Sequence, residues 1–118
     1  MLLILVPVGI ACIAAALYHG YLGQTRLIGP AKFPNPQAQA LVGMIWQFST
    51  ASWAVCGALI ALSPYLFDTG SRRVAVVCAC LPICWGIIGN FWITRGRHFG
   101  WKIFAAIVAA AVAGAYAS

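Results

Sequence analysis

The stretch MLLILVPVGIACIAAALYHGYLG, residues 1–23, is apolar almost throughout and contains no Asp, Glu, Lys or Arg. An α-helix needs about 20 predominantly apolar residues to cross the hydrocarbon core of a bilayer, so this stretch is long enough for one span. A cleaved signal peptide would start with a basic region, and no basic residue precedes this apolar run. The stretch therefore predicts a retained transmembrane helix, with Pro7 tolerated in its early turns.

Three further apolar runs follow, separated by short segments that hold nearly all the charges and half of the six prolines. The second run is studded with polar residues in its first half, and the third contains Pro82, which should bend its helix because proline lacks a backbone N–H. The sequence predicts an all-α membrane protein, a four-transmembrane-helix antiparallel up-down bundle with short loops and no soluble domain. The predicted helices, within a single transmembrane domain 1–118, are about 2–23, 40–65, 74–94 and 99–117.

Composition agrees with a membrane location, since 64% of the 118 residues are apolar and only 7% are charged. A soluble domain carries roughly a quarter of its residues as Asp, Glu, Lys and Arg. The net charge of +6 comes from seven basic residues and one acid, Asp68. In a membrane chain such an excess is typical of the positive-inside rule and of contact with anionic lipid. Nucleic acid is not an expected partner, because no basic face exists outside the short loops.

The distribution of basic residues predicts the orientation. The second loop carries two of them, Arg72 and Arg73, and the first and third loops, on the opposite side, carry five: Arg26, Lys32, Arg95, Arg97 and Lys102. Five against two places loops one and three in the cytoplasm and both termini outside it. In a bacterial inner membrane, both ends of this multi-pass chain would be periplasmic.

The cysteines and the small residues of the last run are expected to serve packing. All five cysteines lie in apolar runs, without the spacing of a zinc site, so no metal site is predicted: Cys12, Cys56, Cys78, Cys80 and Cys84. Small residues recur four apart at Ala106, Ala110 and Gly114, a spacing that lets helices approach closely. That face either packs within the monomer or forms the seam of a homodimer.

Polar residues gather at one predicted face of the bundle, at the end of the first and third helices and the start of the second and fourth. Polar groups within a membrane are costly, so their concentration indicates a functional site. Large rings beside small residues would form its apolar walls, at Trp53 and Trp85. No catalytic residue is predicted, and the candidate ligand-binding residues are His19, Gln47, Ser49, Trp53, Trp85, Asn90, Arg95, Arg97 and His98.

Some of these residues also have a plainer interpretation. Arg95 and Arg97 suit a carboxylate or phosphate, because a guanidinium donates two parallel hydrogen bonds, but they also keep a loop cytoplasmic. His19 could instead make an interhelical hydrogen bond, for instance to Gln47 or Ser49. Tryptophans near helix ends, here Trp46, Trp92 and Trp101, also form interfacial belts, whereas Trp53 and Trp85 sit deeper, where packing or ligand contact suits them better.

Three strings carry a resemblance to a known group: HGYLGQTR at residues 19–26, WQFSTASW at residues 46–53 and RGRHFGW at residues 95–101. They are similar to small, uncharacterised bacterial four-helix inner-membrane proteins, in which the first string reads His-x-x-x-Gly-x-x-Arg and the last Arg-Gly-Arg-His-x-x-Trp. This chain has Gln47 where the group has a histidine after the tryptophan. The resemblance supports the site and implies no chemistry for it.

The function predicted is that of a binding or accessory module. Its polar and basic cytoplasmic end would hold an anionic or amphiphilic ligand, such as an anionic lipid or a small anion, or a partner subunit of a membrane complex. One alternative is a small transporter working as an oligomer, although the chain has no Glu for carboxylate-coupled export. Another is a haem- or quinone-binding redox subunit with His19 and His98 as haem ligands; otherwise no cofactor is expected. Enzymatic activity is not favoured, since the single carboxylate lies on the other side.

Overall fold

The computed structural model describes residues 1–117, and within that range the chain is helical apart from short connections and contains no strand. This confirms the predicted all-α class. The elements, in order, are α1 (Leu2–Leu22), the π-helical segment η1 (Gly23–Ile28), α2 (Pro36–Leu66), α3 (Thr69–Thr94) and α4 (Gly100–Tyr116).

Three of the helical stretches have the length and composition of membrane spans. They are Leu2–Ile28, Pro36–Leu66 and Thr69–Thr94. The fourth helix, α4, is also apolar but has 17 residues. Its length of about 26 Å falls a little short of the roughly 30 Å hydrocarbon core of a bilayer. The chain thus has the character of a membrane protein with three candidate spans and a shorter apolar helix.

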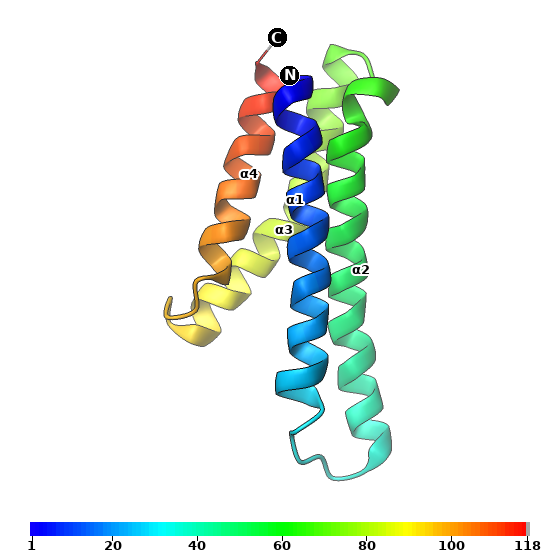
Figure 1. The fold of residues 1–118 in the computed structure, drawn as a ribbon, viewed down its shortest axis with the longest axis vertical. Coiled ribbons are helices and arrows are strands. Elements are labelled where there is room, and N and C mark those ends of the chain that lie inside the picture. Colours follow the sequence, from blue (N-terminus) through cyan, green and yellow to red (C-terminus); the bar gives the residue numbers. More distant parts are fainter. Residues whose placement is uncertain (118) are drawn as a thin grey trace.

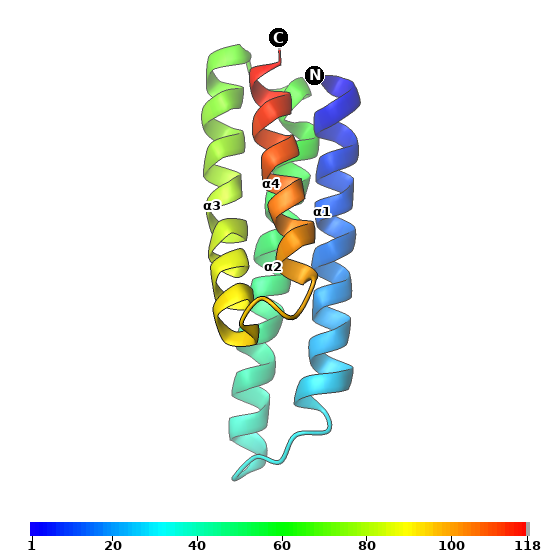
Figure 2. The same ribbon diagram turned by 90° about the vertical axis from the view of Figure 1, so that its left-hand side faces the viewer.

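The helices form a ring in which α1 contacts α2, α2 contacts α3, α3 contacts α4, and α4 contacts α1. Both termini lie at one end of the molecule and the α1–α2 connection at the other (Figures 1 and 2). The α3–α4 connection stops well short of the α1–α2 connection in both views. Residues 23–45, which extend beyond it, are called the hairpin arm below. Figure 1 also shows the second half of α3, which contains Pro82, bending away from α1 and α2.

Two helices begin earlier than predicted, because each has a side-chain cap in the segment expected to be a loop. Asn35 Oδ1 accepts a hydrogen bond from the Ala38 N–H at 2.8 Å, and Pro36 occupies the first position of α2. Asp68 Oδ1 accepts from the Ser71 N–H at 2.8 Å and starts α3 at Thr69. Arg72 is therefore helical, and the predicted second loop shrinks to two residues.

The bundle is centred on Trp53 of α2, whose side chain is only 9% exposed and contacts the other three helices. Its ring lies 4.5 Å from His19 of α1 and 4.8 Å from Phe104 of α4, centroid to centroid. Its indole N–H donates to the Pro82 carbonyl of α3 at 3.1 Å. A Cβ at Gly86 would collide with the same ring, so α3 approaches Trp53 only because that residue is glycine.

Candidate functional site

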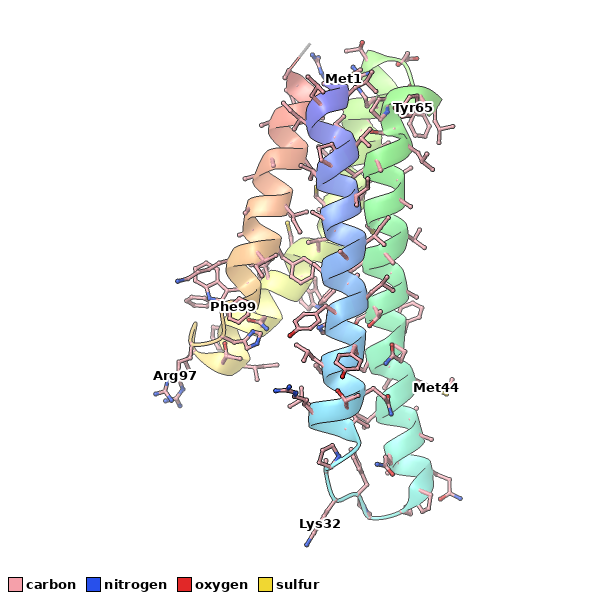
Figure 3. All side chains as sticks on the ribbon, in the orientation of Figure 1. Met1, Lys32, Met44, Tyr65, Arg97 and Phe99 are labelled. Atoms are coloured by element: carbon pink, nitrogen blue, oxygen red, sulfur yellow. The ribbon has the colours of Figure 1, made fainter. Side chains whose placement is uncertain are left out.

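Six of the nine predicted site residues fall into two groups. The first, called the His19 cluster, lies between α1 and α2 and consists of the predicted His19, Ser49 and Trp53 together with Trp46, which was not predicted as a site residue. The second, called the basic loop, is residues 95–98, which connect α3 to α4. Figure 3 shows Arg97 of this loop pointing away from the bundle, and Lys32 at the tip of the hairpin arm.

His19 is held between two indole rings and a hydroxyl. Its ring stacks on Trp46 at 4.4 Å with an interplanar angle of 10°, and it is tilted by 49° to Trp53. Its Nε2 lies 3.1 Å from Ser49 Oγ, which confirms one of the two interhelical partners expected for it. The Ser49 hydroxyl donates its only proton to the Trp46 carbonyl at 2.6 Å. With that proton engaged, Ser49 Oγ accepts from His19, so Nε2 carries a proton.

The same part of α2 also binds the backbone of α1 where its α-helical turns give way to the π-helical segment. Trp46 Nε1 donates to the His19 carbonyl at 3.0 Å, and Gln47 Nε2 donates to the Gly20 carbonyl at 3.1 Å. The change to π-helical turns disturbs the regular hydrogen bonding of carbonyls, and these side chains supply additional donors. Gln47 therefore has a structural role in addition to its predicted place in the site.

The basic loop turns sharply through two residues with left-handed backbone conformations. Arg95 has φ 52° and Gly96 has φ 73°. The Gly96 N–H donates to the Phe91 carbonyl at 2.9 Å and so closes the end of α3. Trp101 Nε1 donates to the Gly96 carbonyl at 3.2 Å, and the Trp101 ring meets Phe91 edge-on at 5.2 Å. These contacts fix the loop against both helices.

The basic loop borders an open hollow of about 560 Å³, lined by Ile93, Thr94, Arg95, Arg97 and His98. The orientation of His98 is fixed because its Nδ1 accepts from the Gly100 N–H at 3.1 Å. In the neutral ring the proton is then on Nε2, which is a donor. Arg95, Arg97 and His98 thus line an open hollow that has no acidic side chain in its lining. This arrangement suits an anion.

Asn90 lies next to this hollow. Its backbone carbonyl accepts from Thr94 Oγ1 at 2.7 Å, and Thr94 Oγ1 in turn accepts from the His98 N–H at 3.4 Å. Its side-chain oxygen is buried and accepts no hydrogen bond from the described part of the chain. Buried polar atoms are normally hydrogen-bonded, so Asn90 Oδ1 is an unsatisfied acceptor within the described part of the chain.

Trp85 belongs to neither group. Its side chain is 77% exposed on the outside of α3, whereas Trp53 is buried at the centre. In the sequence both tryptophans lie at a similar distance from their helix ends. Only the way α3 packs against the bundle leaves Trp85 exposed while Trp53 is buried. A Trp on an outward face contacts lipid or another protein.

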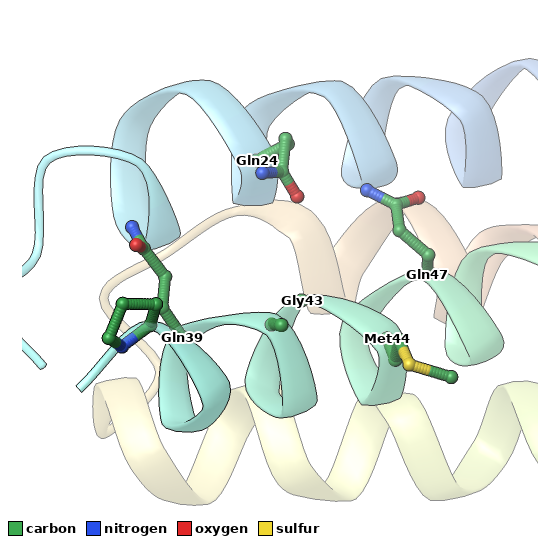
Figure 4. Close-up of a pocket in the computed structure, with 7 residues that line it drawn as sticks. Gln24, Gln39, Gly43, Met44 and Gln47 are labelled. Carbon is green, nitrogen blue, oxygen red and sulfur yellow. The ribbon is translucent and has the colours of Figure 1, made fainter.

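Sequence reasoning overlooked a groove along the hairpin arm, shown in Figure 4. It is open, has a volume of about 380 Å³ and is lined largely by amide and small side chains. Gln39 Nε2 donates to the Ile28 carbonyl at 3.2 Å, which ties α2 to the end of η1. The recurrence of glutamine at positions 24, 39 and 47 was the available signal. The lining residues are Gln24, Pro36, Gln39, Ala40, Gly43, Met44 and Gln47.

The cysteines occupy different environments. Cys12 and Cys80 are buried in the core, and the Cys12 thiol donates to the Trp53 carbonyl at 3.5 Å. Cys78 is exposed, and Cys56 and Cys84 are half-buried. In residues 1–117 no group of three or more His, Cys, Asp or Glu side chains is arranged to hold a metal ion.

Comparison of the chain with known protein families, with curated proteins and with solved structures finds no match.

Proposed function

We propose that this protein is an integral membrane binding module that holds an anionic group at the basic loop. The observation that carries the proposal is the hollow of about 560 Å³ beside Arg95, Arg97 and His98. Asp68, the single acid of the chain, lies on the α2–α3 connection near the termini, so no carboxylate of the chain neutralises the loop. Two arginines without a neighbouring carboxylate are stabilised more by binding an external anion than arginines that already form an ion pair.

The proposed setting is a four-span, up-down antiparallel bundle with α4 as the fourth span and the basic loop on the cytoplasmic side. The termini at one end of the molecule and the five-to-two distribution of basic residues support it. The inner membrane of a bacterium, with periplasmic termini, remains the proposed location.

The depth of the bundle in the bilayer follows from the unequal reach of its connections. Trp53 and Phe104 touch and so share a depth. About 26 Å of α2 lies between Pro36 and Trp53, but only about 6 Å of α4 lies between Gly100 and Phe104. On these helix lengths Pro36 lies about 20 Å beyond Gly100, so the hairpin arm reaches well past the α3–α4 connection.

This difference in reach bears on the choice between two positions in the membrane. If the tip of the hairpin arm lay at the lipid surface, Arg95 and Arg97 would be in hydrocarbon, at a cost of about 2.5–3.5 kcal/mol each. If the basic loop lies at the head groups, both arginines stay solvated and α4 covers most of the hydrocarbon core. We adopt the second position, in which the hairpin arm projects into the cytoplasm.

The proposal is tested by measuring anion binding to the purified protein in an uncharged detergent. Thermal-shift titrations with inorganic phosphate and with citrate should show saturable stabilisation. Replacing Arg95 or Arg97 by Ala should weaken binding by about 1–3 kcal/mol each, because a hydrogen bond to a charged group is lost.

Arg26→Ala and Lys32→Ala are the matched controls, since both residues are exposed basic side chains near the tip of the hairpin arm. Arg72 is unsuitable as a control, because its side chain is 5% exposed and its removal would disturb packing. Equal effects in both sets of variants, or no stabilisation by either anion, would refute binding at the basic loop.

A further inference from the structure

The hollow beside the basic loop has an apolar wall as well as its charged rim. Ile93 lines it and is 82% exposed, and the neighbouring Trp92 is 80% exposed. Phe99, on the other side of the loop, is also exposed and stacks on His98 at 5.1 Å. A small soluble anion would use the charged groups and leave these apolar side chains unoccupied.

The apolar wall continues along the outer face of α3. Ile88 and Trp85, both exposed, extend it from Trp92 toward the middle of the helix. A ligand with a charged head and a long apolar chain would therefore meet cationic donors at one end and exposed apolar side chains at the other. Burial of that surface would add a hydrophobic contribution that a soluble anion lacks.

We infer that the anion held by the basic loop is the phosphate group of an anionic membrane lipid, whose acyl chain lies along the outer face of the second half of α3. The inference rests on the proposed function and on the depth at which it places the loop. At the head-group layer, lipid phosphates are the most abundant anions, and the cytoplasmic leaflet adds a negative surface potential. Arg95 and Arg97 donate to phosphate oxygens, and His98 adds its Nε2–H.

The test compares a lipid with its own soluble head group. Native mass spectrometry of the protein in an uncharged detergent measures binding of phosphatidylglycerol, of phosphatidylcholine, and of glycerophosphoglycerol, which is the first lipid without its acyl chains. Phosphatidylglycerol should bind about tenfold or more tightly than either of the others, because only it combines net negative charge with acyl chains.

Variants assign the two contributions to residues. Arg95→Ala/Arg97→Ala should bring phosphatidylglycerol to within about twofold of phosphatidylcholine, whereas Arg26→Ala/Lys32→Ala, with the same change of net charge, should preserve the preference. Ile93→Ser should weaken phosphatidylglycerol binding and leave binding of glycerophosphoglycerol unchanged. The comparison of ligands on the unmodified protein needs no variant, so it holds even if one of these fails to fold.

The outcomes separate this inference from the proposed function. If glycerophosphoglycerol binds as tightly as the intact lipid, the basic loop is a site for soluble anions; the lipid inference is then wrong and the proposed function stands. If neither phosphatidylglycerol nor the soluble anions bind, both are wrong. Preferential lipid binding that survives the loss of both arginines would place the lipid elsewhere and overturn the inference.

Discussion

Trp53 determines how closely the four helices can approach, because one ring contacts His19, Pro82, Gly86 and Phe104. An indole with its N–H bonded and both faces covered has a single position in the bundle. The residues around it must therefore be small or flat, and the glycine on α3 is the most constrained of them.

Gly86→Ala should lower the free energy of unfolding by about 1–3 kcal/mol, because the added methyl group overlaps the Trp53 ring. Gly89→Ala is the matched control on the same helix, since a Cβ there meets nothing within 4 Å. That change should stabilise the helix by up to about 1 kcal/mol. Denaturant unfolding in micelles, followed by tryptophan fluorescence, measures both. Similar effects at the two positions would contradict the central role of Trp53.

Some residue contacts could be predicted from the sequence and others could not. A histidine inside an apolar helix requires a hydrogen-bonding partner, so the pairing of His19 with Ser49 was one of two expected outcomes. The exposure of Trp85 was not predictable. Residues 85 and 92 share one face of α3, but the sequence does not show whether that face turns toward the bundle or away from it. Only contacts with other helices fix that rotation.

At the scale of elements, the helix ends depend on capping side chains. Asp68 caps α3 through its bond to Ser71 and lies outside the membrane-spanning segments. Hydrogen bonds from Ser71 and Gly70, together with the nearby Arg72, lower the pKa of the Asp68 carboxyl below its ordinary value of 3.8. The carboxylate is the form that caps the helix.

A lowered folded-state pKa means that the capping contribution is present above pH 3.8 and is lost as the pH falls through the folded-state pKa. The unfolding temperature of the protein should therefore drop on acidification below about pH 4. Asp68→Asn should keep the cap, since asparagine is an equally good N-cap, but remove this acid-dependent loss. Unfolding scans between about pH 6 and pH 3 compare the two proteins. A parallel pH dependence in both would show that another group is responsible.

The boundaries of the helices were predicted only in part, because the residues at the helix ends were misread. The apolar runs located all four helices, but charges and prolines were taken to mark loops. Pro36 instead occupies the first turn of α2, where proline is favourable, and Arg72 lies in the first turn of α3, which the Asp68 cap begins. The π-helical continuation of α1 depends on contacts with Trp46 and Gln47, and no local sequence pattern predicts these.

At the scale of the whole molecule, the predicted single polar end is divided. Ser49 lies one turn from Trp53, and Gly100 lies one turn from Phe104, so the His19 cluster and the basic loop are at similar depth. Position along each helix was therefore predictable from the sequence. The lateral separation was not, because it follows from the bend of α3 and from the different lengths of α2 and α4.

The orientation predicts which side of the membrane a terminal fusion occupies. Alkaline phosphatase joined after Ser118 should be active and green fluorescent protein at the same position dark, because both termini are expected outside the cytoplasm. Fusions truncated after Lys32 should give the opposite pair of results. A fluorescent C-terminal fusion with an inactive phosphatase would reverse the topology and place the basic loop outside the cytoplasm.

The hairpin arm also makes this chain of 118 residues a practical target for imaging. The two sides of the arm are helical up to Ile28 and from Pro36 onward, and the Gln39 side chain ties them together by its hydrogen bond to the Ile28 carbonyl. A rigid helical domain could be grafted in place of the exposed connection, in register with both helices. In the proposed membrane position it would stand clear of the detergent belt and serve as a fiducial for electron microscopy, while the basic loop stays unaltered.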